Sequence, residues 1–258
     1  MAKLVFITGA SGGIGQALAL RYYRAGFSLA LVARRAGEIE AWTALNEIST
    51  DRHQVYCADV AQVDSIVAAG KDCLACQGVP DVVIACAGIS VGVDTAERTD
   101  LDQMTQTFVT NNVGTAATFH PFVAAMKLRG SGALVGIGSV NGIRGFAGHG
   151  ANCPSKAAMI VYCESLRLEL KASGIKVVTL CPGYVATALT RHNTFSMPFL
   201  MQPSDFADHA YRAIESGVSY RVIPWQMGIV AKVLRLMPNW VFDRAFSGRA
   251  RKARQEAA

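Results

Sequence analysis

Short apolar runs recur along the chain, and longer amphipathic stretches lie between them. The runs have the length of buried strands and occupy residues 4–7, 28–33, 55–58, 81–86, 132–138, 176–180 and 220–224. The stretches between them are interpreted as helices at 16–25, 36–48, 63–76, 101–111, 114–129, 153–173 and 203–216. Strands that alternate with helices predict an α/β fold, a doubly wound parallel sheet with helices on both faces. A chain of 258 residues can bury one sizeable core, so we expect a single domain.

A glycine-rich turn, Thr8-Gly9-Ala10-Ser11-Gly12-Gly13-Ile14-Gly15, joins the first strand to the first helix. This arrangement brings backbone N–H groups and the positive end of a helix dipole to one point, which favours a pyrophosphate. Gly9 permits the tight turn, Gly13 allows close approach to phosphates, and Gly15 lets the helix pack near the strand. The fold is therefore predicted to be Rossmann-type, with its ligand crevice at the carboxyl ends of the strands.

The spacing of this turn is TGxxxGxG, which differs from the GxGxxG of other dinucleotide-binding folds. It resembles the turn of the classical short-chain dehydrogenase/reductase family, and the resemblance covers about residues 3 to 225. Members of that family pass a hydride between a nicotinamide cofactor and a carbonyl or alcohol. The resemblance implies cofactor contacts at Thr8, Gly9, Ser11, Gly13, Ile14 and Gly15.

Two arginines, Arg34 and Arg35, directly follow the second strand. In dinucleotide-binding folds an acidic residue here binds the ribose hydroxyls, whereas an arginine accommodates the 2′-phosphate of NADP. Ala33 stands where NAD-dependent relatives would carry the acid. NADP(H) is therefore the predicted cofactor, with one alternative left open, that the arginines merely begin the solvated helix 36–48.

The resemblance implies further cofactor contacts at the ends of later strands. An Asp-Val pair would lie against the adenine, and a PGxVxT segment would hold the nicotinamide amide. Where the family has Asn-Asn-Ala-Gly, this chain has Ala85-Cys86-Ala87-Gly88 and so lacks two asparagine side chains. The Asp-Val pair is Asp59 and Val60, and the PGxVxT segment supplies Pro182, Gly183, Val185 and Thr187. With Ala87, Gly88, Lys156 and the two arginines, Arg34 and Arg35, these complete the predicted cofactor-binding residues.

The resemblance also implies a catalytic set, with a serine to hold the substrate oxygen, a tyrosine as acid and base, and a lysine one helical turn later. Ser139 and Lys156 fit the first and last of these roles. The tyrosine position lies thirteen residues after Ser139 and four before Lys156, and residue 152 is asparagine. Asn111 matches the asparagine that holds a water in the family's proton relay, with a structural helix cap as the alternative. The predicted catalytic residues are Asn111, Ser139, Asn152 and Lys156.

An asparagine amide neither gives nor takes a proton near neutral pH, so we expect little or no turnover. No other group is expected to replace the tyrosine, because Tyr162 lies on another helix face and belongs to the core, Tyr184 lies away from the relay, and His149 lines the cleft. Two interpretations stay open. The chain is an inactivated form of an active reductase, or it is a natural sensor or partner subunit that binds NADP(H) without reacting.

Residues 188–201 correspond to the segment that covers the substrate in members of the family. The apolar side chains of this segment are Leu189, Phe195, Met197, Phe199, Leu200 and Met201. They favour a hydrophobic ketone or secondary alcohol as substrate, although core packing would produce the same composition.

The tail, residues 225–258, lies outside the resemblance. We expect it to be a basic amphipathic extension of a catalytic domain formed by residues 1–224, and not a separate domain. Lys232, Arg235 and Pro238 interrupt its apolar run too early for a membrane-spanning helix. Three roles stay open: contact with an anionic membrane or lipid-like substrate, packing on a neighbouring subunit, and roofing of the active site.

Charge and cysteine content narrow the class of partner. The 25 basic and 19 acidic residues give a net charge of +6, which suits an anionic cofactor, and no strip of aromatic and basic residues supports nucleic-acid binding. The seven cysteines form no regular framework and are expected to be reduced thiols. Cys73 and Cys76 form a CxxC without a second pair of ligands, so no metal site is predicted.

The first strand begins almost at residue 1, without a charged and apolar leader, so a cytoplasmic protein is expected, with membrane association through the tail left open. The expected partner is a small-molecule carbonyl or alcohol substrate. The resemblance further implies a homodimer or homotetramer, because classical members usually assemble in this way.

Overall fold

The computed structural model describes residues 2–191, 196–248 and 251–254. Its central sheet has the strand order β3-β2-β1-β4-β5-β6-β7. Its strands are β1 (Leu4–Thr8), β2 (Ser28–Ala33), β3 (His53–Cys57), β4 (Val82–Ala85), β5 (Gly132–Ile137), β6 (Ile175–Pro182) and β7 (Tyr220–Ile223). All neighbouring strands pair in parallel. The strand order reverses between β1 and β4, which opens a crevice at their carboxyl ends.

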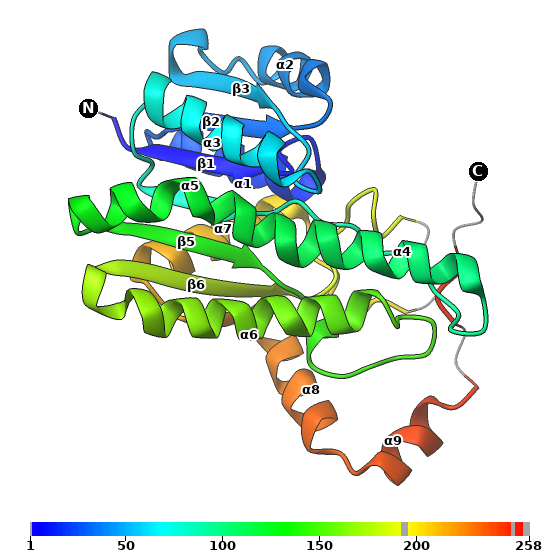
Figure 1. Cartoon of the computed structure of the whole chain (residues 1–258). Coiled ribbons are helices and arrows are strands. Elements are labelled where there is room, and N and C mark those ends of the chain that lie inside the picture. The colour runs from blue at the N-terminus through cyan, green and yellow to red at the C-terminus, as the bar shows by residue number, and fades with distance from the viewer. Residues whose placement is uncertain (1, 192–195, 249–250, 255–258) are drawn as a thin grey trace.

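Helices cover both faces of the sheet, as Figure 1 shows. On one face α1 (Gly13–Arg24) packs against α7 (Pro203–Ser216). The other face carries α3 (Val63–Cys76), α5 (Gly114–Arg129) and α6 (Asn152–Leu170). The remaining helices are α2 (Ala36–Leu45), α4 (Arg98–Phe108), α8 (Trp225–Leu236) and α9 (Asn239–Phe246), with short 3-10 turns at Thr50–Arg52, Val140–Gly142 and Lys171–Ser173. The predicted doubly wound α/β fold is confirmed.

The core forms two layers because successive side chains of a strand point to opposite faces of the sheet. In β1, Val5 and Ile7 belong to the layer that includes α1 and α7, whereas Leu4 and Phe6 belong to the layer that includes α3, α5 and α6. All four side chains are at most 4% exposed. The apolar runs of the sequence lack polar alternation because helices cover both faces.

Several helix boundaries differ from those expected, and two of the differences lie near the carboxyl edge of the sheet. The first helix begins at Gly13, not at residue 16, because the end of the glycine turn already has helical backbone. The helix expected over 101–111 begins at Arg98 and passes at Val109–Val113 into a π-helical turn, η2, which leads directly into α5. A π-helical turn inside a longer helical run often marks a functional site.

The tail begins with α8 and α9, which stand below the sheet in Figure 1, and the chain then rises toward the loop before α4. In the described part of the chain, no helix combines the length and the apolar character needed to cross a membrane. Phe195 of the cover segment lies outside the described residues, as do residues 249–250 and 255–258 of the tail.

Candidate active site

A cavity of about 1350 Å³ follows the carboxyl edge of the sheet. It is bordered by the ends of the strands, by the loop between β5 and α6, and by α8 and α9. The predicted residues that line it are Gly9, Ser11, Gly13, Ile14, Gly15, Arg34, Asp59, Val60, Ala87, Gly88, Ser139, Asn152, Lys156, Pro182, Gly183, Val185 and Thr187. Three predicted residues, Thr8, Arg35 and Asn111, are not part of this lining.

The glycine turn leaves no room for side chains at its critical positions. Gly9 has φ +69°, and a Cβ there would lie 2.8 Å from the backbone of Ala87. A Cβ at Gly15 would lie 2.2 Å from the carbonyl oxygen of Gly9. The N-cap of α1 is Gly12, which offers no side chain, and the first turn of the helix carries no acidic residue. The N–H groups at this helix start are therefore available to an anion, and the turn fits the pyrophosphate of a dinucleotide.

The two candidate arginines of the 2′-phosphate site differ in their surroundings. Arg34 lines the cavity, with its side chain 68% exposed and its Nη1 4.0 Å from a carboxylate oxygen of Asp59. Arg35 forms an ion pair with Glu38, its Nε 2.9 Å from Oε1, on the first turn of α2. Arg34 can thus reach a phosphate in the cavity, whereas Arg35 has the helix-starting role that the sequence left as an alternative.

Thr8 is buried at the end of β1, and its side chain links β1 to the turn that follows β4. Its hydroxyl accepts hydrogen bonds from the backbone N–H groups of Cys86 at 3.2 Å and Ala87 at 3.4 Å. The threonine thereby fixes the turn after β4, in which the family's asparagines are missing. Thr8 does not line the cavity, so its predicted contact with the cofactor stays a prediction.

Asn111 lies in the π-helical turn and is 2% exposed. Its amide accepts a hydrogen bond from the N–H of Ile89 at 2.9 Å and donates to the carbonyl of Ile89 and to Ser155 Oγ, both at 3.0 Å. A Cβ at Gly88 would lie 3.1 Å from Asn111 Oδ1 and 3.5 Å from Lys156 Nζ. Asn111 therefore ties the loop after β4 to α6 directly behind the cavity wall.

The predicted reacting side chains converge on the cavity from β5 and α6. Ser139 follows β5, and its hydroxyl accepts a hydrogen bond from the N–H of Asn141 at 3.1 Å. Lys156 donates from Nζ to the carbonyl of Ile137 at 3.0 Å, and burial lowers the pKa of its ammonium group. Asn152 lies one helical turn before Lys156, is 3% exposed, and has no described partner for its buried Oδ1.

The sequence offers three other titratable side chains as substitutes for the tyrosine, and the structure places them differently. His149 lines the cavity, and burial, with the charge of Lys252, lowers its pKa to about 4, so it is neutral at pH 7. Tyr162 stacks on Phe119 at a ring distance of 6.5 Å, and burial raises its pKa to about 12. Tyr184 lines the cavity next to the predicted nicotinamide end. The described residues contain no cluster of three or more potential metal ligands.

The described apolar residues of the cover segment differ in their relation to the cavity. Leu189 lines the cavity, whereas Phe199 and Leu200 are 50% and 46% exposed and lie outside the lining. Met201 forms a bridge with Val185 and packs on the core. Further apolar walls come from α8 and α9, whose lining residues include Met227, Val230, Ala231, Leu234, Phe242 and Phe246.

Helices α8 and α9 form a roof over the cavity, and the sequence did not reveal the contacts that hold this roof in place. Arg144 donates to the carbonyl oxygens of Leu234 at 2.6 Å and Met237 at 2.5 Å, and its guanidinium lies 4.1 Å from the ring centre of Phe242. Phe146 packs on Phe242 at a ring distance of 5.7 Å. Of the three roles left open for the tail, roofing of the site is the one that this geometry gives to α8 and α9.

The chain matches the family described as short chain dehydrogenase over residues 3–196. It is 33% identical over 243 residues to an uncharacterized oxidoreductase of Myxococcus xanthus. The alignment covers 94% of this chain and 96% of that protein. The chain therefore belongs to the short-chain dehydrogenase/reductase family, and it is an oxidoreductase by family.

Solved structures share the fold. A short-chain dehydrogenase from Streptomyces avermitilis superposes with a TM-score of 0.81 at 26% identity, with 95% of each chain covered. The protein ElxO, solved with NADP bound, has a TM-score of 0.78 at 23% identity and covers 86% of this chain and 97% of its own. The second likeness is one of fold alone.

Proposed function

We propose that this protein is an NADP(H)-dependent carbonyl reductase or alcohol dehydrogenase in which Asn152 limits the chemistry. The observation that carries the proposal is that Ser139, Asn152 and Lys156 line the same cavity as the glycine turn and Arg34. An exposed guanidinium at the end of β2 suits a 2′-phosphate, which favours NADP(H) over NAD(H). ElxO, a protein of the same fold, binds NADP. The apolar walls from α8 and α9 suit a hydrophobic ketone or secondary alcohol.

When bound, NADP(H) supplies or accepts the hydride of this reaction. The Ser139 hydroxyl can donate a hydrogen bond to a carbonyl oxygen in the cavity. Lys156 supplies a buried positive charge, and Asn111 holds the loop that carries Gly88 against it. The Asn152 amide can donate a hydrogen bond to the same oxygen but has no proton to release, so the substrate oxygen lacks its acid.

Restoring a phenol at position 152 tests this proposal. We expect Asn152→Tyr to raise the rate of NADPH oxidation with a panel of aliphatic and aromatic ketones by roughly 10² to 10⁴, the usual contribution of a general acid. Asn152→Phe is the matched control, because it introduces the same ring without the hydroxyl. Both variants are also titrated with NADPH and followed by its fluorescence.

The second candidate is a natural sensor or partner subunit that binds NADP(H) without reacting. Saturable NADPH binding by wild type and both variants, with no gain in rate in Asn152→Tyr, would favour it. A wild-type titration with no saturable fluorescence change would overturn both candidates.

The oligomer and the location of the protein are further parts of the proposal. Family membership supports a homodimer or homotetramer, which light scattering of the purified chain would measure. We propose a cytoplasmic protein whose tail touches an anionic membrane. The outward side of α8 and α9 supports this, because its apolar side chains are largely exposed: Trp225 66%, Ile229 55%, Val233 54%, Leu236 83% and Trp240 74%.

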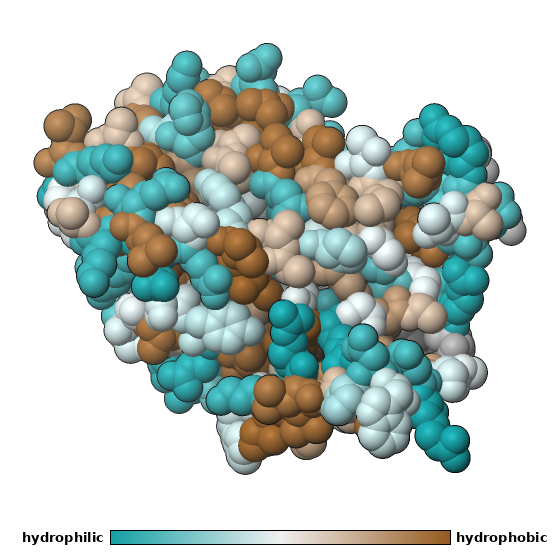
Figure 2. All heavy atoms as spheres, turned by 60° about the horizontal axis from the view of Figure 1, so that its bottom comes forward, coloured by the Kyte–Doolittle hydropathy of each residue, from teal (hydrophilic) through white to brown (hydrophobic). Residues whose placement is uncertain are grey.

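Figure 2, in which the lower side of Figure 1 comes forward, shows hydrophobic residues gathered at the lower edge of the molecule. Lys232 and Arg235 are exposed and lie on α8, the helix that also carries the exposed Trp225, Ile229, Val233 and Leu236. The double variant Leu236→Glu/Trp240→Glu should no longer sediment with anionic liposomes, while Leu128→Glu, on α5 and 92% exposed, should behave as wild type. A change of oligomer in the double variant without loss of liposome binding would assign the surface to a second copy.

A further inference from the structure

The end of the described tail, residues 251–254, is called here the C-terminal strap. It passes between two loops of the domain, and Gly92 forms a parallel bridge with Arg254. A Cβ at Gly92 would lie 2.2 Å from the carbonyl oxygen of Ala253, and a Cβ at Gly148 would lie 2.8 Å from the backbone nitrogen of Lys252. The strap is therefore packed backbone against backbone in a slot that depends on two glycines.

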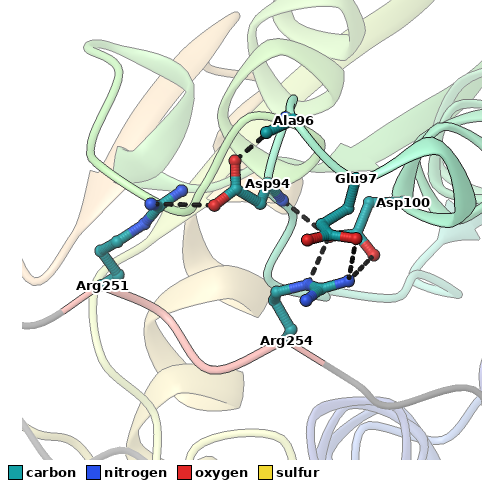
Figure 3. A network of polar contacts seen from close by, with 6 residues as sticks. All are labelled: Asp94, Ala96, Glu97, Asp100, Arg251 and Arg254. Carbon is teal, nitrogen blue, oxygen red and sulfur yellow. Dashed lines mark hydrogen bonds and ion pairs between the residues drawn. The ribbon is translucent and has the colours of Figure 1, made fainter.

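Ion pairs fasten both ends of the strap, as Figure 3 shows. Arg251 Nη1 lies 3.0 Å from Asp94 Oδ2. Arg254 donates to both carboxylate oxygens of Asp100, at 2.8 Å and 3.1 Å, and lies 3.7 Å from Glu97. The Asp100 side chain is only 5% exposed and also accepts the N–H of Asp94. The two arginines of the strap thus each have a carboxylate partner.

Lys252 lies between these anchors, and its surroundings are different. Its side chain lines the cavity, and its ammonium group donates a hydrogen bond to Ser90 Oγ. Within the described residues it forms no ion pair with an aspartate or glutamate. Burial lowers its pKa, and its charge in turn lowers the pKa of His149. Burial of a cation whose partner is only a hydroxyl costs free energy unless an anion pairs with it.

We propose that Lys252 is a specificity-determining residue that binds an anionic group, a carboxylate or phosphate, carried by the substrate. The inference rests on the proposed function, because it places a substrate in the same cavity. The cofactor phosphates are expected at the glycine turn, whereas Lys252 donates to Ser90 and its backbone packs on Gly92 and Gly148. The apolar walls and the Lys252 ammonium group together select a ketone with an apolar body and an anionic end.

Binding, rather than turnover, tests this inference, because Asn152 is expected to suppress the reaction. The full chain is titrated calorimetrically with methyl ketones that end in a carboxylate, at increasing chain length, and with their methyl esters. A phosphonate series separates the two anions. Each titration is made with and without saturating NADPH.

Three variants assign the effect. Lys252→Met removes the charge and keeps both strap anchors, whereas Lys252→Arg keeps the charge. Lys232→Met makes the same substitution at an exposed lysine of α8 that does not line the cavity. We expect wild type, Lys252→Arg and Lys232→Met to bind the best anionic ketone at least about tenfold more tightly than its ester, and Lys252→Met to lose this preference.

Equal affinity of wild type for acids and esters would overturn the inference, and so would an unchanged preference in Lys252→Met. Melting temperature and NADPH affinity are measured for every variant, since a binding-site change should leave both near the wild-type values. Failure of NADPH to bind would refute the proposed function, and the titrations without NADPH would still decide the role of Lys252.

Discussion

The two walls of the cavity are built in different ways. The glycine turn at one wall is made by neighbouring residues, from β1 through Gly15 into α1. The opposite wall, formed by α8, α9 and the strap, is held by side chains far away in the sequence, such as Arg144 with Leu234 and Arg254 with Asp100. The first wall can be recognised from a motif, whereas the second becomes visible only in three dimensions.

The two kinds of wall correspond to two proposed tasks, binding of the cofactor and binding of the substrate. The cofactor is common to the family, so its site uses backbone groups that depend on few side-chain identities. The substrate differs among members, and the walls that we propose for it here, α8, α9 and the strap, lie outside the family match, which ends at residue 196. The roof and strap can therefore vary without disturbing the glycine turn.

The largest effect is expected at the glycine turn. Gly15→Ala would place a Cβ 2.2 Å from the carbonyl oxygen of Gly9, so the turn must shift, at a cost of about 3 kcal/mol. NADPH binding should weaken by more than about tenfold, and thermal unfolding should occur at lower temperature. Gly37→Ala on α2 meets nothing within 4 Å and serves as the control. Equal NADPH affinity in both variants would contradict the packing argument.

The roof should respond to Arg144→Met with a smaller loss of stability. The variant removes hydrogen bonds to two carbonyl oxygens and the contact with Phe242, which together contribute about 2 kcal/mol. We expect faster proteolysis within residues 225–254 and unchanged NADPH affinity. Lys232→Met is the control for loss of a surface charge. Reduced NADPH affinity would show that the two walls are not independent.

The cofactor preference should depend on one arginine of the pair. Arg34→Met is expected to weaken NADPH binding by about tenfold and leave NADH binding unchanged, because the charge that faces the cavity is lost. Arg35→Met should have little effect on either cofactor, since Arg35 is paired with Glu38. Equal losses in the two variants would assign the 2′-phosphate to both arginines.

The strap should loosen in acid. Hydrogen bonds from Arg254, and then from the N–H of Asp94, lower the pKa of Asp100. A carboxylate with a lowered folded-state pKa stabilises the structure above the unfolded value of about 3.9, and this contribution is lost as the pH falls through the folded value. Hydrogen exchange of residues 251–254 should therefore quicken below about pH 4, relative to β5 amides in the same sample. Asp100→Asn should remove this pH dependence, and its persistence would point to another group.

Much of the site could be predicted because its signals are local. The apolar runs, the glycine turn and the spacing of Ser139, residue 152 and Lys156 each depend on residues close in sequence, and the structure brings these residues to one cavity. Within the described part of the cover segment, the sequence could not separate Leu189, which lines the cavity, from the exposed Phe199, which does not. Composition records that a segment is apolar but not which side of it faces the substrate.

The sequence by itself determined the parallel sheet, the glycine-rich turn and the position of Asn152 one helical turn before Lys156, because hydrophobic periodicity, glycine conformation and helical spacing are properties of short segments. Only the tertiary structure decided that Arg35 turns to Glu38, that Arg144 holds the roof, and that Lys252 reaches the cavity. Pairings between residues far apart in the chain are set by the geometry of the packed fold, and no local pattern encodes them.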